Sequence, residues 1–315
     1  MADAQVPTRK DSSQQTAVAR ASAPAFALVN PPASQLGLRN AVYSGTNTRH
    51  ETGEVPGWLS IKTVIAGSAV WETPERRFVV DESSYLILND RHRYSLSFES
   101  TTPVATFVLF FKRGLAEDVL HCCTNPTERL LDEPAGAKGV AEFFERIETR
   151  ASPLFGLLER FRRRVTTGIG TDEAETWFAR LAEQMVREQR GMAHEMARLP
   201  AVRASTRSEL YRRLRRGRDF LLSNAGERTT LDDAARAACL SPYHFHRAFK
   251  QAFGETPHQT LTRHRLARAA VLLAAGDSVT NACLATGFES VGSFSSLFRR
   301  HYRVPPRDYR KRPPQ

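Results

Sequence analysis

Two stretches near the C-terminus decide the fold of this chain of 315 residues: residues 231–257 read LDDAARAACLSPYHFHRAFKQAFGETP, and residues 279–306 read VTNACLATGFESVGSFSSLFRRHYRVPP. They are imperfect copies of each other. The first part of each copy aligns at an offset of 48 residues and the second part at an offset of 49, so the segment between the parts is one residue longer in the second copy. The matched positions are Leu231, Ala234, Ala235, Leu240, Phe245, Phe249, Lys250, Phe253 and Pro257 with Val279, Ala282, Cys283, Phe288, Phe294, Phe298, Arg299, Tyr302 and Pro306.

Each copy predicts two helices joined by a tight turn. Small residues on the first helix allow the two helices to cross closely. In the first copy, Ser241 supplies an N-cap and Pro242 a proline at the first helical position. In the second copy, Gly287 suits the turn and Ser290 is the expected cap. The pattern therefore predicts a helix-turn-helix unit in each copy.

The second helix of each copy has an aromatic face and an opposite, more polar face. In the first copy the polar face is rich in donors that could read base edges or grip phosphates in a DNA major groove. The matching face of the second copy is flatter and has fewer side chains that could read base edges. The alternative is a pair of helical hairpins that merely pack together. The outward positions are Tyr243, His244, Arg247, Lys250 and Gln251 in the first copy, and Gly292, Ser293, Ser296, Arg299 and Arg300 in the second.

One long helix is predicted between the copies, from Pro257 to Ala275, with Arg263, Arg265 and Arg268 along it. At 1.5 Å per residue, about 18 residues span roughly 27 Å. With the turns added, the two polar faces could reach successive major grooves, which lie roughly 34 Å apart on one side of B-DNA.

The charge distribution agrees with this interpretation. The chain carries a formal net charge of +11, and its 41% hydrophobic and 25% charged residues are an ordinary globular composition. Residues 201–315 hold 21 Lys and Arg against 9 Asp and Glu, a net of +12, which leaves −1 for residues 1–200. Such concentration is typical of a domain that binds a polyanion, because Lys and Arg placed against phosphates release counterions. A solvated basic face is the alternative.

The N-terminal half has a different pattern. Residues 1–38 are rich in Ala, Ser, Gln and Pro and predict a disordered arm. Residues 39–125 contain short β-branched and aromatic runs separated by turn residues, which predict an antiparallel sandwich or small barrel. The expected strands are Trp58–Ala66, Ala69–Glu72, Arg77–Val80, Tyr85–Leu88, Tyr94–Phe98 and Val104–Phe111.

Residues 126–208 are predicted to form a helical linker, and residues 209–315 the helix-turn-helix domain. In the linker, apolar residues recur at helical spacing from Phe143, Phe144 and Ile147 onward. A helix over about Glu173–Glu195 carries a stripe that suits either a dimer seam or a core. The expected fold class is thus α+β: an N-terminal antiparallel β domain, a helical linker and a C-terminal all-α domain. The stripe residues are Trp177, Leu181, Met185 and Glu188.

The stretch from Leu231 to Arg310 resembles the AraC/XylS family of bacterial transcription regulators, above all in residues 240–250 (LSPYHFHRAFK), Gly287–Ser290, Pro305-Pro306 and Tyr309-Arg310. The N-terminal half more weakly resembles the cupin-like sensor domains of that family. Arg303 stands where the family usually has glycine. The resemblance implies base-contacting positions at Tyr243, His246 and Arg247 in the first copy and at Val291, Gly292, Ser293, Ser295 and Ser296 in the second.

The resemblance implies a sequence-specific DNA-binding regulator, an activator under the control of a small-molecule effector bound in the N-terminal domain. The implied partners are double-stranded DNA, that effector, a second copy of the chain in a homodimer, and RNA polymerase. Two other readings are an effector-independent DNA-binding protein and a metal-dependent cupin-type enzyme fused to a DNA-binding domain.

The sequence offers little support for the enzyme. His50, His92 and Glu72 are scattered rather than spaced as metal ligands, so neither a metal site, a cofactor nor catalytic residues are expected. Cys122 and Cys123 could be a redox sensor or an inert pair, whereas Cys239 and Cys283 lie at small-residue positions and are expected in the core. No apolar run is long enough for a membrane span, which predicts a cytoplasmic protein without membrane contact.

Overall fold

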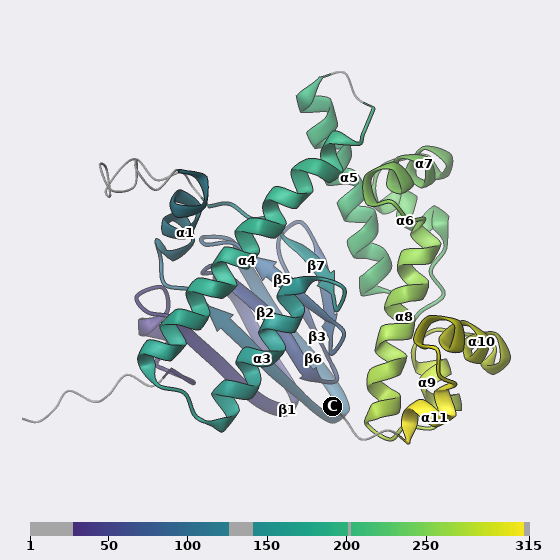
Figure 1. Cartoon of the computed structure of the whole chain (residues 1–315), viewed down its shortest axis with the longest axis horizontal. Helices are drawn as coiled ribbons and strands as arrows, with labels where there is room; N and C mark the ends of the chain where they lie inside the picture. The colour runs from purple at the N-terminus through teal and green to yellow at the C-terminus, as the bar shows by residue number, and fades with distance from the viewer. Residues whose placement is uncertain (1–27, 126–140, 201–202, 312–315) are drawn as a thin grey trace, which may run out of the picture.

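The computed structural model describes residues 28–125, 141–200 and 203–311. A curled antiparallel sheet forms one side of the molecule, and a group of helices from the C-terminal third lies beside it (Figure 1). The elements before the C-terminal third are the 3-10 helix η1 (Ala33–Gln35), the strands β1 (Ala41–Pro56), β2 (Ser60–Ala66), β3 (Ser68–Glu72), β4 (Arg77–Asp81), β5 (Ser84–Leu88), β6 (Arg93–Phe110) and β7 (Arg146–Thr149), and the helices α1 (Leu115–Thr124), α3 (Pro153–Thr167) and α4 (Thr171–Ala197).

The C-terminal part is helical. Its elements are α5 (Ala204–Ser223), α6 (Leu231–Ala237), α7 (Pro242–Phe253), α8 (Pro257–Ala274), α9 (Val279–Ala285), α10 (Val291–Tyr302) and α11 (Pro306–Arg310). The α+β class is confirmed, with the β domain first and the helical domain last. Helix α5 runs through residues 208 and 209, where the domain boundary was predicted, so one continuous helix leads into the C-terminal domain.

The strands form one sheet in the order β4-β3-β6-β2-β5-β7, and β1 also pairs with β6. The predictions for β2 to β5 are confirmed. The two runs predicted as separate strands, Tyr94–Phe98 and Val104–Phe111, are instead one strand, β6. Pro103 does not break it, because the pairing of β1 with β6 passes from Glu99 directly to Val104 at a register shift, and no paired position falls on the proline.

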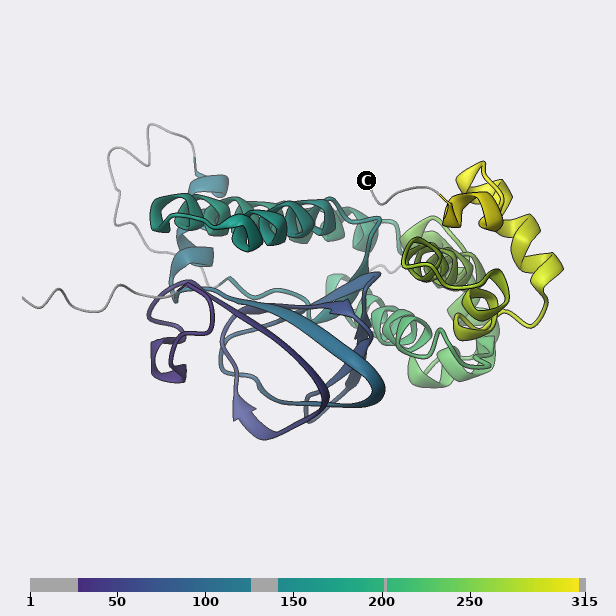
Figure 2. The ribbon, with the colours of Figure 1, turned by 90° about the horizontal axis from the view of Figure 1, so that it is seen from below.

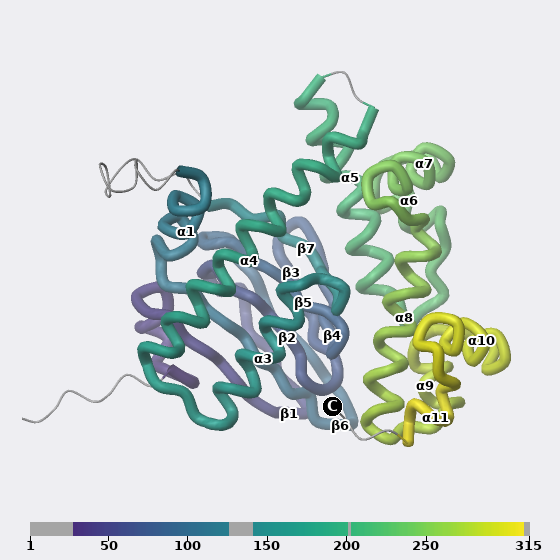
Figure 3. Tube along the Cα trace, viewed as in Figure 1, coloured from purple at the N-terminus to yellow at the C-terminus, as the bar shows by residue number. Residues whose placement is uncertain are grey.

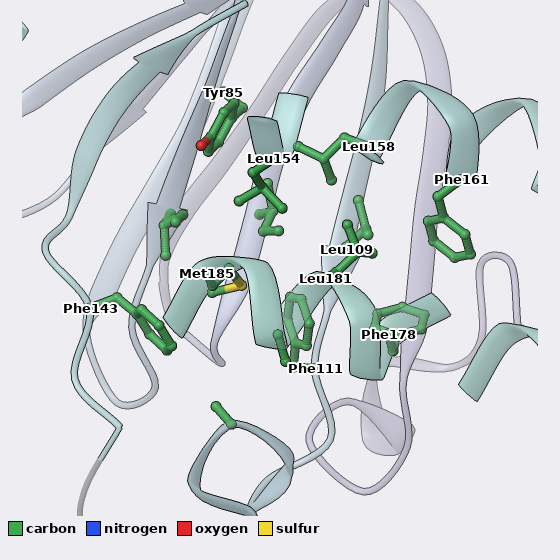
Figure 4. Packing of buried hydrophobic residues seen from close by; sticks show 14 of the residues in the cluster. Tyr85, Leu109, Phe111, Phe143, Leu154, Leu158, Phe161, Phe178, Leu181 and Met185 are labelled. Atoms are coloured by element: carbon green, nitrogen blue, oxygen red, sulfur yellow. The ribbon is translucent and has the colours of Figure 1, made fainter. Parts of the chain in front are cut away.

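The two faces of the sheet carry separate cores. The inner face is filled by side chains that include Trp71, Phe78 and Leu86, all with no exposed surface. The outer face is covered by α3 and α4, whose Phe161, Phe178 and Leu181 pack in one cluster with strand residues and with Phe111, which directly follows β6 (Figures 2 and 4). Each large side chain buried in this way contributes roughly 1.5 to 3 kcal/mol to stability. Burial on both faces explains why every residue of β5 is buried.

The stripe on α4 belongs to this core. Leu181 and Met185 are buried, and Trp177 packs on Phe161. Glu188 accepts hydrogen bonds from Tyr85 Oη at 3.1 Å and Ser152 Oγ at 2.7 Å. Because these side chains are used within the chain, this stripe does not offer a dimer seam.

Two sequence predictions for the N-terminal half are wrong. Residues 28–38 are not disordered: Val29 forms a parallel bridge with Val42, and η1 follows. Residues 1–27 of the predicted arm and 126–140 of the predicted linker lie outside the described residues. The helical pattern over Phe143–Ile147 is not a helix, because β7 pairs with β5 and buries Ile147 completely in the inner core. Pairing with a distant strand overrides the local periodicity there.

Candidate nucleic-acid interface

Each copy of the duplicated sequence forms the predicted pair of helices, α6 with α7 and α9 with α10. The connection spans residues 238–241 in the first copy and 286–290 in the second, which locates the extra residue in the turn. Ser241 and Ser290 are the N-caps, accepting hydrogen bonds from the backbone N–H of His244 at 3.3 Å and of Ser293 at 3.4 Å. The capping predictions are confirmed.

Small residues let the paired helices approach closely. Ala234 and Ala235 of α6 have no exposed surface and pack in one cluster with Phe245 and Phe249 of α7. The second copy repeats this arrangement with residues of α9 and α10: Ala282, Cys283, Phe294 and Phe298. The aromatic face of each second helix is thereby fixed toward the core, and the opposite face is left outside.

Two positions in each copy adopt the left-handed backbone conformation, and in each copy one of them is not glycine. At the turn, Cys239 has φ +51° and its counterpart Gly287 has +81°; after the second helix, Gly254 has +77° and Arg303 has +62°. Cys239 is therefore an exposed turn residue and not a core cysteine as predicted, because ending α6 here requires this conformation. Cys283 is buried as predicted, while Cys122 is exposed and Cys123 is half-buried.

We expect Arg303→Gly to raise the free energy of unfolding by about 0.5 to 1 kcal/mol, because an L side chain at positive φ is strained and glycine is not, less the entropy that glycine loses on folding. Urea unfolding followed by circular dichroism measures this gain. Gly254→Ala is the matched control: the added Cβ would meet nothing closer than 3.9 Å, so the expected loss comes from the backbone alone. A destabilised Arg303→Gly protein would contradict this explanation.

The outward faces of α7 and α10 are where the sequence placed them. In Figure 1, α7 lies at one end of α8 and α10 lies alongside α8, both on the side away from the sheet. Tyr243 is 76% exposed. Of the other predicted contact residues, Gln251 and Ser295 are half-buried, and those that are exposed are His244, His246, Arg247, Lys250, Val291, Gly292, Ser293, Ser296, Arg299 and Arg300.

Helix α8 holds the two units together, ending one residue before the predicted Ala275. Its arginines are engaged within the protein and do not form a free basic face. Arg263 pairs with Glu255 at 2.7 Å, and Arg265 donates to the carbonyl oxygens of Ala225 and Glu227, each at 2.7 Å. Part of the positive charge counted in the sequence is thus structural, whereas Arg247 and Lys250 of α7 and Arg299 and Arg300 of α10 are exposed.

The helical domain is joined to the sheet by buried ion pairs. Arg268 of α8 lies 3.3 Å from Asp81, the last residue of β4, and His264 lies 4.0 Å from the same carboxylate. In Figure 3 the trace of β4 lies at the edge of the sheet that faces α8. Burial opposes the charge of Asp81, but His264, Arg268 and hydrogen bonds from Ser83 outweigh it and lower the pKa of this carboxyl.

A second buried cluster joins α5 to β7. The carboxylate of Glu148 accepts from Arg215 at 3.0 Å and Arg218 at 3.2 Å, and it also contacts Arg146. Arg215 and Arg218 are buried, although they belong to a run of five arginines between residues 212 and 218. Nothing local to α5 indicates this, because their partner lies 67 and 70 residues away in the sequence.

The residues weighed as metal ligands are engaged separately. His92 Nδ1 lies 2.6 Å from Glu145, His50 stacks on Phe98, and Glu72 pairs with Arg77. Within residues 28–125, 141–200 and 203–311, no group of three or more His, Cys, Asp or Glu is arranged to hold a metal ion. In the same ranges, no helix is both long enough and apolar enough to cross a membrane.

The geometry defines a tandem helix-turn-helix domain, and comparison with known proteins agrees. The family model described as "Helix-turn-helix domain" matches residues 234–312. The HTH-type transcriptional regulator MtrA of Neisseria gonorrhoeae is 38% identical over 82 residues, and the HTH-type transcriptional activator RhaS of Escherichia coli O139:H28 is 37% identical over 93 residues. These matches cover 26% and 29% of this chain, and the chain spans only 27% and 34% of the length of these two curated relatives.

Solved structures are also similar. An AraC-type regulator from Chromobacterium violaceum is 31% identical over 35% of this chain and 95% of its own, with a TM-score of 0.30. ToxT from Vibrio cholerae O395 is 11% identical over 87% of this chain and 96% of its own, with a TM-score of 0.33. Residues 234–312 therefore match a helix-turn-helix family model, and over this region the chain is similar to HTH-type and AraC-type transcription regulators. Both curated relatives are described as HTH-type transcription regulators.

Proposed function

We propose that this chain is a transcriptional regulator that binds double-stranded DNA with α7 and α10 in successive major grooves. The observation that carries the proposal is the pair of capped helices joined through α8, each with its aromatic face buried and its polar face exposed. Helix α8 has 18 residues, and a helix of that length spans roughly 27 Å. Successive major grooves lie about 34 Å apart on one side of B-DNA, so the length of α8 together with the turns beside it is compatible with this spacing.

The two helices are assigned different tasks. Tyr243, His246 and Arg247 carry side chains long enough to reach base edges, and Arg can bind guanine through two hydrogen bonds. The second helix exposes Gly292 and serines at the matching positions, so phosphate contacts by Arg299 and Arg300 dominate its binding. His244, Lys250 and Gln251 flank the first contact face, and Val291, Ser293, Ser295 and Ser296 the second.

The experiment uses the full-length chain and a pool of random duplex DNA. Repeated selection is expected to enrich one sequence motif with two half-sites about one helical turn apart. Fluorescence anisotropy of the selected duplex at several salt concentrations should then give a log–log slope near −0.9 for each phosphate contacted. Equal, weak affinity for every duplex in the pool, with no enrichment, would contradict the proposal.

The remaining roles are also part of the proposal. A small-molecule effector bound by the N-terminal region would control DNA binding, and the chain would act as a homodimer that activates transcription through RNA polymerase in the cytoplasm. The division into residues 39–125, 126–208 and 209–315 is also part of the proposal, except that β7 belongs to the sheet and α5 crosses the second boundary. The RhaS relative is described as an activator, which supports that sign of regulation. Since the stripe on α4 is buried, dimerisation would use another surface.

A further inference from the structure

An open groove lies where the β domain meets α5. Its walls are the turn between β3 and β4, the turn between β5 and β6, residues 142–146, and the part of α5 around Arg212–Arg216. Its volume is about 750 Å³, and a second hollow of about 620 Å³ continues along α5. Glu75, Arg76 and Arg216 line both spaces. Ligand sites of small molecules typically have volumes of roughly 300 to 1,000 Å³, so the groove is large enough for one.

The inside of the curled sheet is a poorer place for a ligand, because its own side chains occupy it. Trp71 and Phe78 are completely buried there, and Lys62 reaches between the rings of Tyr94 and Phe110, 4.0 Å and 4.4 Å from their centres. A ligand inside would have to displace several of these side chains. The groove beside α5 needs no such rearrangement.

The groove is lined by seven arginines and three glutamates. Most of these arginines have carboxylate partners: Glu148 holds Arg146 and Arg215 at the back of the groove, while Arg91, Arg93 and Arg212 lie beside surface carboxylates. Among the residues that the structure describes, Arg216 has neither a hydrogen-bond nor an ion-pair partner.

Arg76 stands beside Arg216 where the two spaces meet. It donates to Asp219 at 3.1 Å and to the carbonyl oxygen of Glu145 at 3.1 Å, and its guanidinium lies 5.0 Å from the ring of Phe78. Of the glutamates, Glu145 is occupied, since His92 and the backbone N–H of Asn89 contact it. Pro74 and Phe144 add apolar surface to the same groove.

We propose that this groove binds a small organic anion, with its carboxylate or phosphate on Arg76 and Arg216 and its apolar part against Pro74 and Phe144. Guanidinium groups match either oxyanion through two parallel hydrogen bonds. This inference deepens the proposed function, since it rests on the chain being an effector-controlled regulator and names the site and the chemical class of the effector.

The groove is coupled to the first recognition helix through α5. Arg216 lies on the groove side of α5, and the next residue, Gly217, touches α7 so closely that an added Cβ would lie 2.4 Å from the ring of Phe245. An anion on Arg76 also competes with Asp219, and that ion pair joins the β domain to α5. An anion bound in the groove therefore alters the packing of α5 against α7.

The test is isothermal titration calorimetry of the full-length protein at constant ionic strength, with three probes of similar shape: benzoate, phenyl phosphate and the neutral benzamide. At least one anion is expected to give saturable heat, and which of the two binds tells whether the site takes a carboxylate or a phosphate. Benzamide is expected to give none. Arg216→Gln should weaken the anion on the order of tenfold or more.

Arg213→Gln is the control, because Arg213 lies on the same helix but pairs with Glu209 outside the groove and should leave the affinity unchanged. The proposal is overturned if neither anion binds, if benzamide binds equally well, or if Arg216→Gln leaves the affinity unchanged. Anisotropy with the selected duplex separates the two proposals: DNA binding without anion binding rejects the groove alone, and anion binding without DNA binding rejects the regulator alone.

Discussion

Replacing Glu148 by alanine is expected to lower the free energy of unfolding by about 3 to 5 kcal/mol, since it leaves buried positive charges without their partner. Its carboxylate contacts the guanidinium groups of Arg146, Arg215 and Arg218, whose side chains are 4%, 6% and 8% exposed. Arg215 would keep Glu195 at 2.9 Å, but Arg218 has only the carbonyl oxygen of Ile147 as a further hydrogen-bond acceptor among the described residues.

Urea unfolding of the full-length protein measures the loss. Glu209→Ala is a matched control, because Glu209 also pairs with two arginines of α5, Arg212 and Arg213, but on the surface. Exposed pairs contribute about 0 to 1 kcal/mol each, so this variant should unfold almost like the wild type. Equal losses of unfolding free energy in Glu148→Ala and Glu209→Ala would show that burial does not determine how much the Glu148 ion pairs contribute to stability.

The same cluster predicts a dependence on pH. Burial opposes the charge of Glu148, but Arg218, Arg146 and Arg215 outweigh it and lower its pKa below the ordinary 4.5. A carboxyl with a lowered pKa stabilises the folded state above its unfolded pKa and loses this contribution as the pH falls. The stability difference between wild type and Glu148→Gln should therefore shrink below about pH 5. A difference that stays constant from pH 7 to pH 3 would contradict the assignment.

Asp219 changes the stability of the folded state with pH in the opposite direction to Glu148. The measurement is therefore the difference in stability between the wild type and Glu148→Gln. Burial raises the pKa of Asp219 to about 6, although Arg76, Arg218 and Arg215 lower it. A carboxyl with a raised pKa favours the folded state most at low pH, and the contribution is lost as the pH rises through the folded value. Both variants keep Asp219, so its titration largely cancels.

The helix-turn-helix units could be predicted from the sequence because their signals are local. Ser241 and Pro242 stand next to the helix that they begin, and the aromatic spacing of α7 lies within twelve residues. The offset of the two copies even located the longer turn. The strand β7 could not be predicted in this way, because Ile147 has helical spacing with its neighbours and only its pairing with β5 makes it a strand residue.

The groove and the ion pairs between the β domain and the helical domain could not be predicted from the sequence either, because they depend on contacts between residues that are far apart in the chain. Arg76 and Asp219 are 143 residues apart, and Arg216 gives no sign in the sequence that it differs from Arg215 beside it. Among the described residues, Arg216 has no hydrogen-bond or ion-pair partner at the groove, whereas Arg215 is buried against Glu148, because neighbouring residues of α5 point in different directions. Charge counts cannot distinguish such residues, whereas the packing of α5 on the sheet does.

Arg247→Ala is expected to weaken binding to the selected DNA by about 1 to 3 kcal/mol, roughly ten- to a hundredfold, if its guanidinium holds a base through two hydrogen bonds. The loss should fall on one base-pair position, where the variant accepts all four bases, and affinity for unrelated duplex should change little. Ser296→Ala is the matched control, because Ser296 occupies the same position 49 residues later in the second copy and its short side chain contributes little.

Arg300→Ala should behave differently from both. As a phosphate contact it should weaken binding to every duplex alike and make the salt dependence shallower by about one unit of slope. Anisotropy titrations against the selected site and its single-base variants, at several salt concentrations, separate the three variants. A loss of affinity for Arg247→Ala that is equal for all duplexes would contradict base reading by α7. A loss for Ser296→Ala confined to one base-pair position would contradict the assignment of phosphate contacts alone to α10.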